Sequence, residues 1–189
     1  MKKTIFTFAF AALSLIVNQT AQAQNLPVNA EESTIHWLGK KVTGQHEGDI
    51  SLKSGNLVMT EGNLTGGQFV VDMTSITCTD LEGKSANNLV GHLKSDDFFG
   101  VETYPEAKLV FTTIENKGGG IFGITGDFTI KGQTHAANFD LNISEGSATA
   151  KVIIDRSKYG VRYGSNSFFD NLGNKAIDDN FELTVNLKL

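Results

Sequence analysis

In the stretch IDDNFELTVNLKL (residues 177–189), apolar and polar side chains alternate with a period of two. One face carries the apolar residues Ile177, Phe181, Leu183, Val185, Leu187 and Leu189, and the other carries Glu182, Thr184, Asn186 and Lys188. Successive side chains of a β-strand point to opposite faces of a sheet, whereas a helix repeats about every 3.6 residues. The stretch is therefore predicted to be a strand with one dry face and one solvated face.

The same alternation continues through most of the chain from Thr34 onward. Two such runs, 139–143 and 148–154, are separated by Glu145-Gly146 at the spacing of a hairpin turn, so we expect them to pair antiparallel. Further strands are expected over residues 34–43, 48–60 with a break near Gly55, 64–73, 107–115 and 122–130. About eight strands with one apolar face either split into a sandwich or close into a barrel, and the pattern alone leaves both open.

Two segments lack the β pattern. In Ser85–Lys94 the apolar residues recur at positions i, i+3, i+4 and i+7, which predicts one short amphipathic helix with Asp80 or Ser85 as its cap. The segment Arg156–Ala176 holds tyrosines, phenylalanines and glycines without a clear period, which predicts a long ordered loop. Loops of that length in compact domains are often functional.

The N-terminal residues Met1–Ala23 have the features of a secretory signal peptide. Lys2 and Lys3 supply a charged end, an apolar run follows, and Ala21-Gln22-Ala23 provides the small residues for cleavage after Ala23. The apolar run is shorter than the roughly 20 residues that a helix needs to span a bilayer, which disfavours a membrane anchor. We therefore expect export to the periplasm, or secretion if the source has no outer membrane.

The composition indicates one compact domain behind this leader. Residues 24–33 are polar and contain Pro27, so they are interpreted as a tether, and residues 34–189 suffice for a single core. The chain has 16 Lys plus Arg against 21 Asp plus Glu, and loss of the leader leaves 14 against 21, or −7, which is not the balance of a nucleic-acid-binding protein. The single cysteine, Cys78, excludes disulfide scaffolds and cysteine-rich zinc sites.

Catalytic signatures are absent from the sequence. It contains no His-Glu-x-x-His, no Gly-x-Ser-x-Gly, no phosphate-binding glycine loop and no dinucleotide fingerprint. The four histidines, His36, His46, His92 and His135, are scattered, with acidic neighbours only at His46 and His92. They are either separate surface and core histidines or a metal site assembled from distant strands.

The expected loop and its neighbours hold the most distinctive polar and aromatic residues. The only two arginines, Arg156 and Arg162, could clamp a polar headgroup at a cavity mouth, or could serve the structure through an Asp155 pair and stacking on a tyrosine. The adjacent pairs Phe98-Phe99 and Phe168-Phe169 could form a mobile apolar gate or could anchor loops to the core.

Four blocks of sequence resemble one known family. They are GHLKSDDFFGVETYPEAKLVFT (91–112), ITGDFTIKGQTH (124–135), DRSKYGV (155–161) and IHWLGKKVTGQHEGDISLKSG (35–55). Together, in their order and spacing along the chain, they resemble the YceI-like, polyisoprenoid-binding family over nearly all of the mature chain. One departure is Leu89-Val90, where many relatives carry Arg-Asp three residues before His92.

The resemblance implies an all-β fold with one short helix, a lipocalin-like eight-stranded antiparallel β-barrel enclosing an apolar cavity. It implies non-catalytic binding, storage or transport of an elongated isoprenoid or quinone-like lipid, without a metal or another cofactor. The candidate residues of the cavity or its mouth are Phe98, Phe99, Phe111, Phe139, Leu141, Arg156, Tyr159, Arg162, Phe168 and Phe169.

Two other functions remain open at the level of sequence. One is an envelope interaction module with a fully packed interior and no ligand. The other is a metal-assisted hydrolase that uses His46, His92 and nearby carboxylates. The lipid-carrier interpretation also allows transient contact with a membrane surface, and it leaves the oligomeric state open.

Overall fold

The computed structural model describes residues 22–189, and nearly all of the leader predicted over Met1–Ala23 lies outside this range. Within it the chain forms β1 (Ala23–Pro27), β2 (Asn29–Lys41), β3 (Gly44–Thr60), β4 (Asn63–Asp72), α1 (Gly83–Lys94), β5 (Glu106–Gly118), β6 (Ile121–Ile130), β7 (Gln133–Ser144), β8 (Ser147–Asp155) and β9 (Ile177–Lys188). Short 3₁₀ turns cover Met73–Ser75, Arg156–Tyr159 and Gly173–Lys175. None of these helices is long and apolar enough to cross a membrane.

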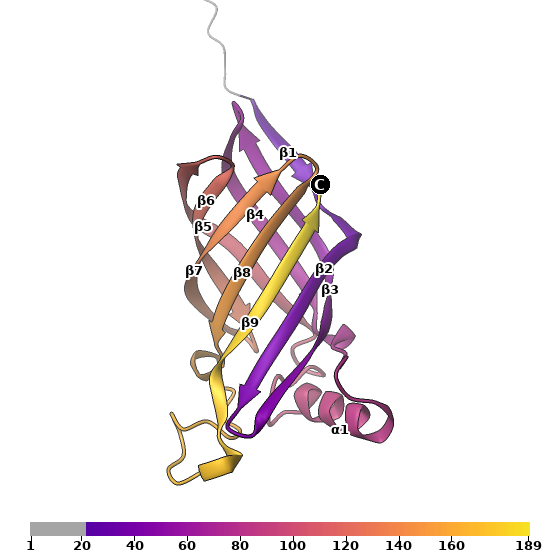
Figure 1. Ribbon diagram of the computed structural model, residues 1–189. Coiled ribbons are helices and arrows are strands. Elements are labelled where there is room, and N and C mark those ends of the chain that lie inside the picture. The colour runs from indigo at the N-terminus through magenta and orange to yellow at the C-terminus, as the bar shows by residue number, and fades with distance from the viewer. Residues whose placement is uncertain (1–21) are drawn as a thin grey trace, which may run out of the picture.

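The sheet closes on itself into an eight-stranded antiparallel barrel (Figure 1). Neighbours follow the order β3, β2, β9, β8, β7, β6, β5, β4, and β4 pairs again with β3. Strand β3 closes the ring because it is long, pairing with β2 through Ile50 and with β4 from Ser51 onward. Closure decides between the two architectures that the sequence left open and confirms the barrel.

The segment 24–33 is a correction to the sequence analysis, because it is not a tether. Its residues form β1 and the start of β2, and β1 pairs with β3 from Ala23↔Thr60 to Pro27↔Asn56. The amide of Val28 donates to the Gly55 carbonyl at 2.9 Å. Pro27 is tolerated at the strand end, where its missing N–H costs no ladder bond. The side chains of Leu26 and Val28 pack on the barrel core.

The remaining elements follow the sequence closely. The hairpin between β7 and β8 has the expected register, from Leu141↔Ala150 to Ser144↔Ser147. The helix is where it was expected, but neither Asp80 nor Ser85 caps it, and its first turn follows Glu82 without a side-chain hydrogen bond. Residues 156–176 form the ordered connection between β8 and β9, with two short 3₁₀ turns.

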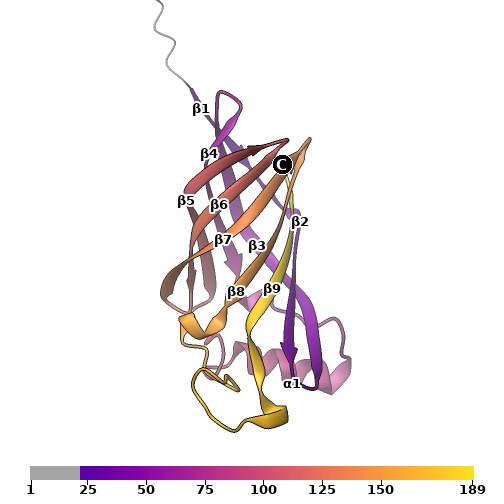
Figure 2. The same cartoon turned by 60° about the vertical axis from the view of Figure 1, so that its left-hand side comes forward.

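The two ends of the barrel differ. The helix end, at the bottom of Figures 1 and 2, carries α1 and the 156–176 loop, and the opposite end carries β1 and the C-terminus. At the opposite end Leu57 and Ala148 are fully buried in the main core. At the helix end a second core cluster lies beneath α1 and consists of Met73, Ile76, Leu93, Phe98, Val101 and Val161. One end of the barrel is therefore sealed by close packing, and the other is covered by a helix and loops.

The inward register of β8 can be tested with two neighbouring isoleucines. Ile154→Ala is expected to lower the free energy of unfolding by about 2–5 kcal/mol, because Ile154 is 1% exposed and faces the interior. Ile153→Ala is the matched control, with an expected loss under about 1 kcal/mol, because Ile153 is 61% exposed. Urea denaturation measures both, and an equal or reversed order of the two losses would contradict the register.

Candidate functional site: the barrel cavity

The interior of the barrel contains a cavity of about 190 Å³. It extends from the middle of the barrel to the space beneath α1, and inward-facing side chains from all eight barrel strands line it. The lining is apolar almost throughout, and its few charged members include Arg156 and Asp178 near the helix end. An apolar cavity of this kind excludes water and favours an apolar ligand.

Aromatic rings occupy much of the interior. The rings of Phe69 and Phe111 have centroids 5.6 Å apart, Phe111 and Phe139 are 5.9 Å apart, and Phe139 and Phe128 are 6.1 Å apart. These four residues, the phenylalanine chain, come from β4, β5, β7 and β6 and all line the cavity. Tilted and edge-on contacts at these separations are favourable for aromatic rings.

Two glycines make room for rings of the phenylalanine chain. A β-carbon at Gly67 would lie 2.5 Å from Cε2 of Phe111, and one at Gly55 would lie 2.4 Å from Cδ1 of Phe69. Both distances are far below van der Waals contact, so a larger residue would push the rings toward the lumen. The glycines therefore let these rings lie against the barrel wall.

The structure brings six of the ten predicted site residues into the cavity wall. The six are Phe98, Phe99, Phe111, Phe139, Leu141 and Arg156. Tyr159 is buried outside the cavity wall, while Arg162 and Phe169 line a separate surface hollow and Phe168 is exposed. Several lining residues were not predicted from the sequence, including Trp37, Phe69, Leu109, Phe128 and Phe181. The period-two pattern is the sequence signal that these residues carry. It separates the two faces of each strand, but it does not show which residues of a face line a cavity.

Arg156 is a structural residue at the helix end of the cavity. Its Nε donates to the Asp178 carbonyl at 3.0 Å, and its terminal nitrogens donate to the carbonyls of Val161, Tyr163 and Ile177 at 3.0, 2.9 and 3.1 Å. The buried guanidinium thereby ties the start of the 156–176 loop to the start of β9. Most of its donors are occupied by backbone, which leaves little capacity to clamp a headgroup.

The charge of Arg156 is compensated locally. Burial lowers the pKa of its guanidinium, while the carboxylates of Asp179, Asp178 and Asp155 raise it. Asp179 contacts the guanidinium at 3.4 Å, and the Phe98 ring lies 5.4 Å from the guanidinium carbon. Because an arginine side chain keeps its proton in proteins, the site holds a permanent buried cation.

Strands β7 and β8 are paired only near the opposite end of the barrel. Their register stops at Leu141↔Ala150, and below it they separate toward the helix end, as Figure 2 shows. Tyr159, which follows β8, lies at this seam: its ring packs against His135 of β7, and its hydroxyl donates to the His135 carbonyl at 3.4 Å. Burial raises the pKa of Tyr159 to about 12, so its hydroxyl remains a neutral donor. Tyr159 therefore fills a gap in the hydrogen-bonded wall.

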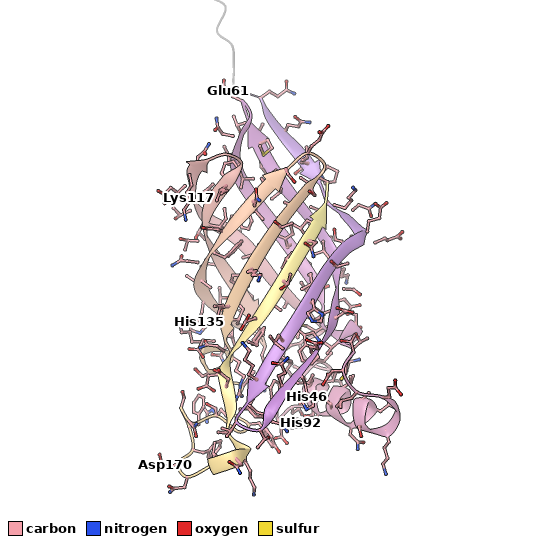
Figure 3. All side chains as sticks on the ribbon, viewed as in Figure 1. His46, Glu61, His92, Lys117, His135 and Asp170 are labelled. Carbon is pink, nitrogen blue, oxygen red and sulfur yellow. The ribbon has the colours of Figure 1, made fainter. Side chains whose placement is uncertain are left out.

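The histidines make separate contacts. The Nδ1 atom of His36 lies 2.9 Å from Asp49, whose hydrogen bond raises the pKa of His36. His46 pairs with Asp80 at 2.8 Å, and His92 packs against the rings of Tyr163 and Phe98. Figure 3 shows His46 and His92 toward the helix end. In the part of the chain that the structure describes, no three His, Cys, Asp or Glu side chains gather as metal ligands would.

Asp80 and Cys78 belong to a structural contact between β3 and the segment after β4. Burial raises the pKa of Asp80, but hydrogen bonds from the Glu47 amide, His46 and Cys78 outweigh it and lower that pKa to about 2. Burial, followed by the contact with Asp80, raises the pKa of the Cys78 thiol. A raised pKa disfavours the reactive thiolate, so these residues fit a structural role.

A closed antiparallel barrel around an apolar interior defines a class of small proteins that can hold one apolar ligand. The chain belongs to a family within this class, because the YceI-like domain model matches residues 27–189. A UPF0312 protein of Staphylococcus epidermidis is 30% identical over 146 residues, covering 63% of this chain and 80% of the relative. A UPF0312 protein of Shewanella denitrificans is 30% identical over 115 residues, covering 57% and 59%.

Solved structures share the fold at low sequence identity. BcnA of Burkholderia cenocepacia has a TM-score of 0.67 at 21% identity, over 85% of this chain and 98% of that one. A polyisoprenoid-binding domain of Saccharophagus degradans has a TM-score of 0.59 at 14% identity, over 89% and 97%. The YceI protein of Campylobacter jejuni has a TM-score of 0.51 at 14% identity, over 100% and 99%. These likenesses confirm the YceI-like barrel.

The structural role of Arg156 predicts a large difference between the two arginines. Arg156→Ala is expected to cost about 3–5 kcal/mol of unfolding free energy and to expose the 156–176 loop to proteolysis, because it leaves buried carbonyls without donors. Arg162→Ala is the control, with an expected change within about 0.5 kcal/mol, because Arg162 is exposed. Denaturation and limited proteolysis measure both, and a stable, protease-resistant Arg156→Ala would overturn the assignment.

Proposed function

We propose that the protein binds an elongated isoprenoid or quinone-like lipid in the barrel cavity, without catalysis, and stores or carries it in the periplasm. The observation that carries this proposal is the apolar cavity inside a closed barrel. Because apolar burial is non-directional, the shape and length of the cavity would select the ligand more than polar contacts do. The polyisoprenoid-binding domain of Saccharophagus degradans, which shares the fold, supports the choice of ligand class.

The size of the cavity sets a condition on this function. Ligand pockets for drug-sized molecules measure about 300–1,000 Å³, and a cavity of about 150 Å³ binds a molecule as small as benzene. The 190 Å³ cavity therefore accepts a fragment of an isoprenoid chain in the form described here. A whole isoprenoid molecule requires a larger cavity. The four rings of the phenylalanine chain line the cavity, and their rotation or tilting would enlarge it without breaking backbone hydrogen bonds of the barrel wall.

The energetics favour such an expansion. An isoprenoid chain that buries several hundred Å² of apolar surface gains on the order of 10 kcal/mol at about 25 cal/mol per Å². Part of this gain is offset by loss of chain freedom and by rearrangement of the rings. The opposite end is closed by packed side chains, whereas a helix and loops cover the helix end, so a polar head would lie at the helix end while the chain points toward the opposite end.

The two other functions have less support. An interaction module without a ligand was expected to have a fully packed interior, whereas this barrel contains a cavity. A metal-assisted hydrolase was expected to use His46, His92 and nearby carboxylates; His46 does pair with the Asp80 carboxylate, but His92 packs among aromatic rings.

Filling the cavity from β8 tests the proposal. Ala150 lines the cavity, so Ala150→Phe is expected to lower the affinity for octaprenol by about tenfold or more. Lys151→Phe is the matched control, because Lys151 is exposed on the outer face of the same strand and should keep the parental affinity. Binding is measured by titrating the leader-free protein with octaprenol and with an octaprenyl quinone. Failure of the parent protein to bind either lipid, or equal affinities of the two variants, would contradict binding in the cavity.

A further inference from the structure

Apolar side chains are exposed together at the helix end. The exposed apolar residues of the 156–176 loop and of the tip of the β2–β3 hairpin include Tyr163 (50% exposed), Phe168 (41%), Phe169 (50%) and Val42 (64%). We call these four residues the end patch. The hairpin tip is tied to the loop, because the Val42 amide donates to the Ala176 carbonyl at 3.2 Å. Figure 3 places Asp170, the neighbour of Phe169, at the extremity of this end.

The loop holds the aromatic residues of the end patch in an ordered turn. The amides of Phe168 and Phe169 both donate to the carbonyl of Ser165, whose side chain is fully buried. The Ile177 amide donates to the Gly164 carbonyl at 2.8 Å, and Arg156 binds the Tyr163 carbonyl. Adjacent phenylalanines held half-exposed in an ordered turn form the kind of apolar patch that is common at interaction sites.

Cationic side chains flank the end patch. The Arg162 guanidinium lies 5.0 Å from the centroid of the Phe168 ring, and Lys175 lines the same surface hollow as Phe169. Lys41 is exposed beside Val42. Within residues 22–189, no acidic side chain lies within ion-pair distance of these three cations. Aromatic rings flanked by cations match the interface of a bilayer, where rings sit at the headgroups and cations meet lipid phosphates.

Acidic groups nearby limit the electrostatic part of such a contact. Asp96 and Asp97 line the surface hollow, Asp170 follows Phe169, and the chain as a whole has a net charge of −5. The Debye length is about 8 Å at physiological salt, so acidic groups elsewhere on the barrel are largely screened. Burial of the aromatic rings would therefore supply most of the binding, and anionic lipid would strengthen it.

Ring contacts connect the end patch with the cavity. Tyr163 packs on His92 with centroids 4.3 Å apart, and His92 packs on Phe98 at 5.6 Å. Phe98 packs on Phe99 at 5.0 Å, and both line the cavity. The buried Nε2 atom of His92 has no hydrogen-bond partner in the described chain, which weakens this layer of packing. These contacts join the end patch to the cavity wall at the helix end.

We propose that the end patch docks on a phospholipid bilayer, with Phe168 and Phe169 in the interface and with Arg162, Lys175 and Lys41 against anionic headgroups, so that lipid passes between bilayer and cavity. This inference rests on the proposed function and adds the surface through which the ligand enters. It assigns the exposed loop residues to docking and the interior residues to holding the ligand.

Flotation with vesicles tests the docking. The leader-free protein is expected to float with vesicles of phosphatidylcholine and phosphatidylglycerol, and less with phosphatidylcholine alone. Phe168→Ser/Phe169→Ser is expected to reduce flotation at least about fivefold, because it removes the inserted rings. Ile153→Ser is the matched control and should float like the parent, since Ile153 is exposed on the barrel wall. No flotation of the parent, or equal flotation of the double variant, would overturn the proposal.

A second variant tests the cations separately, in case the loss of the two phenylalanines affects folding. Arg162→Glu/Lys175→Glu keeps the rings and is expected to lose the preference for phosphatidylglycerol, whereas an unchanged preference would contradict the role of the cations. Thermal unfolding confirms that each variant is folded before flotation is compared.

A separate measurement distinguishes docking from the function on which it rests. Octaprenol added from solution should bind the Phe168→Ser/Phe169→Ser variant as it binds the parent, while transfer of octaprenol from vesicles to the variant should slow at least about fivefold. Equal transfer rates would overturn docking as the entry route. Vesicle flotation without binding of octaprenol by the parent would refute the proposed function and leave the docking surface supported.

Discussion

The pairing of β3 with both β2 and β4 is the constraint on which the rest of the structure depends. This 17-residue strand joins the two ends of the sheet, so the wall has no long free edge and its dry face must enclose a lumen. Aromatic rings fill part of that lumen, two glycines let rings lie against the wall, and the space that remains is the cavity. The contrast between the sealed end and the helix end follows, because the turns at one end are short hairpins and the connections at the other carry α1 and the 156–176 loop.

Arg156 shows how the helix end is kept ordered without being sealed. One buried guanidinium holds four carbonyls from two segments, and this fixes a loop that would otherwise have little core of its own. Next to this loop, the side-chain rings of Tyr163, His92 and Phe98 pack against one another. Such ring contacts can shift without breaking backbone hydrogen bonds. The end therefore combines a base fixed by hydrogen bonds with a layer held by ring contacts, and the proposed entry of a lipid would need that layer to rearrange.

Local periodicity predicted the elements, and long-range pairing decided what the sequence left open. The alternation in 177–189 and the hairpin at Glu145-Gly146 were confirmed because both depend on neighbouring residues. Closure depends on contacts between distant strands, which local alternation does not encode. The role of Arg156 was one of two alternatives for the same reason, since its acceptors include Asp178. Leu26 of β1 and Val28 just after it did carry a period-two signal, but the polar residues around them masked it.

The central claim is that the cavity of this YceI-like barrel holds an isoprenoid chain after its aromatic lining has moved. Native mass spectrometry of the protein isolated from its own source, with solvent extraction of any released molecule, tests this claim most directly. A stoichiometric adduct with the mass of a polyprenyl or quinone lipid is the predicted result. A ligand-free mass that persists after incubation with octaprenol would contradict the claim and would show that the shared fold serves another purpose here.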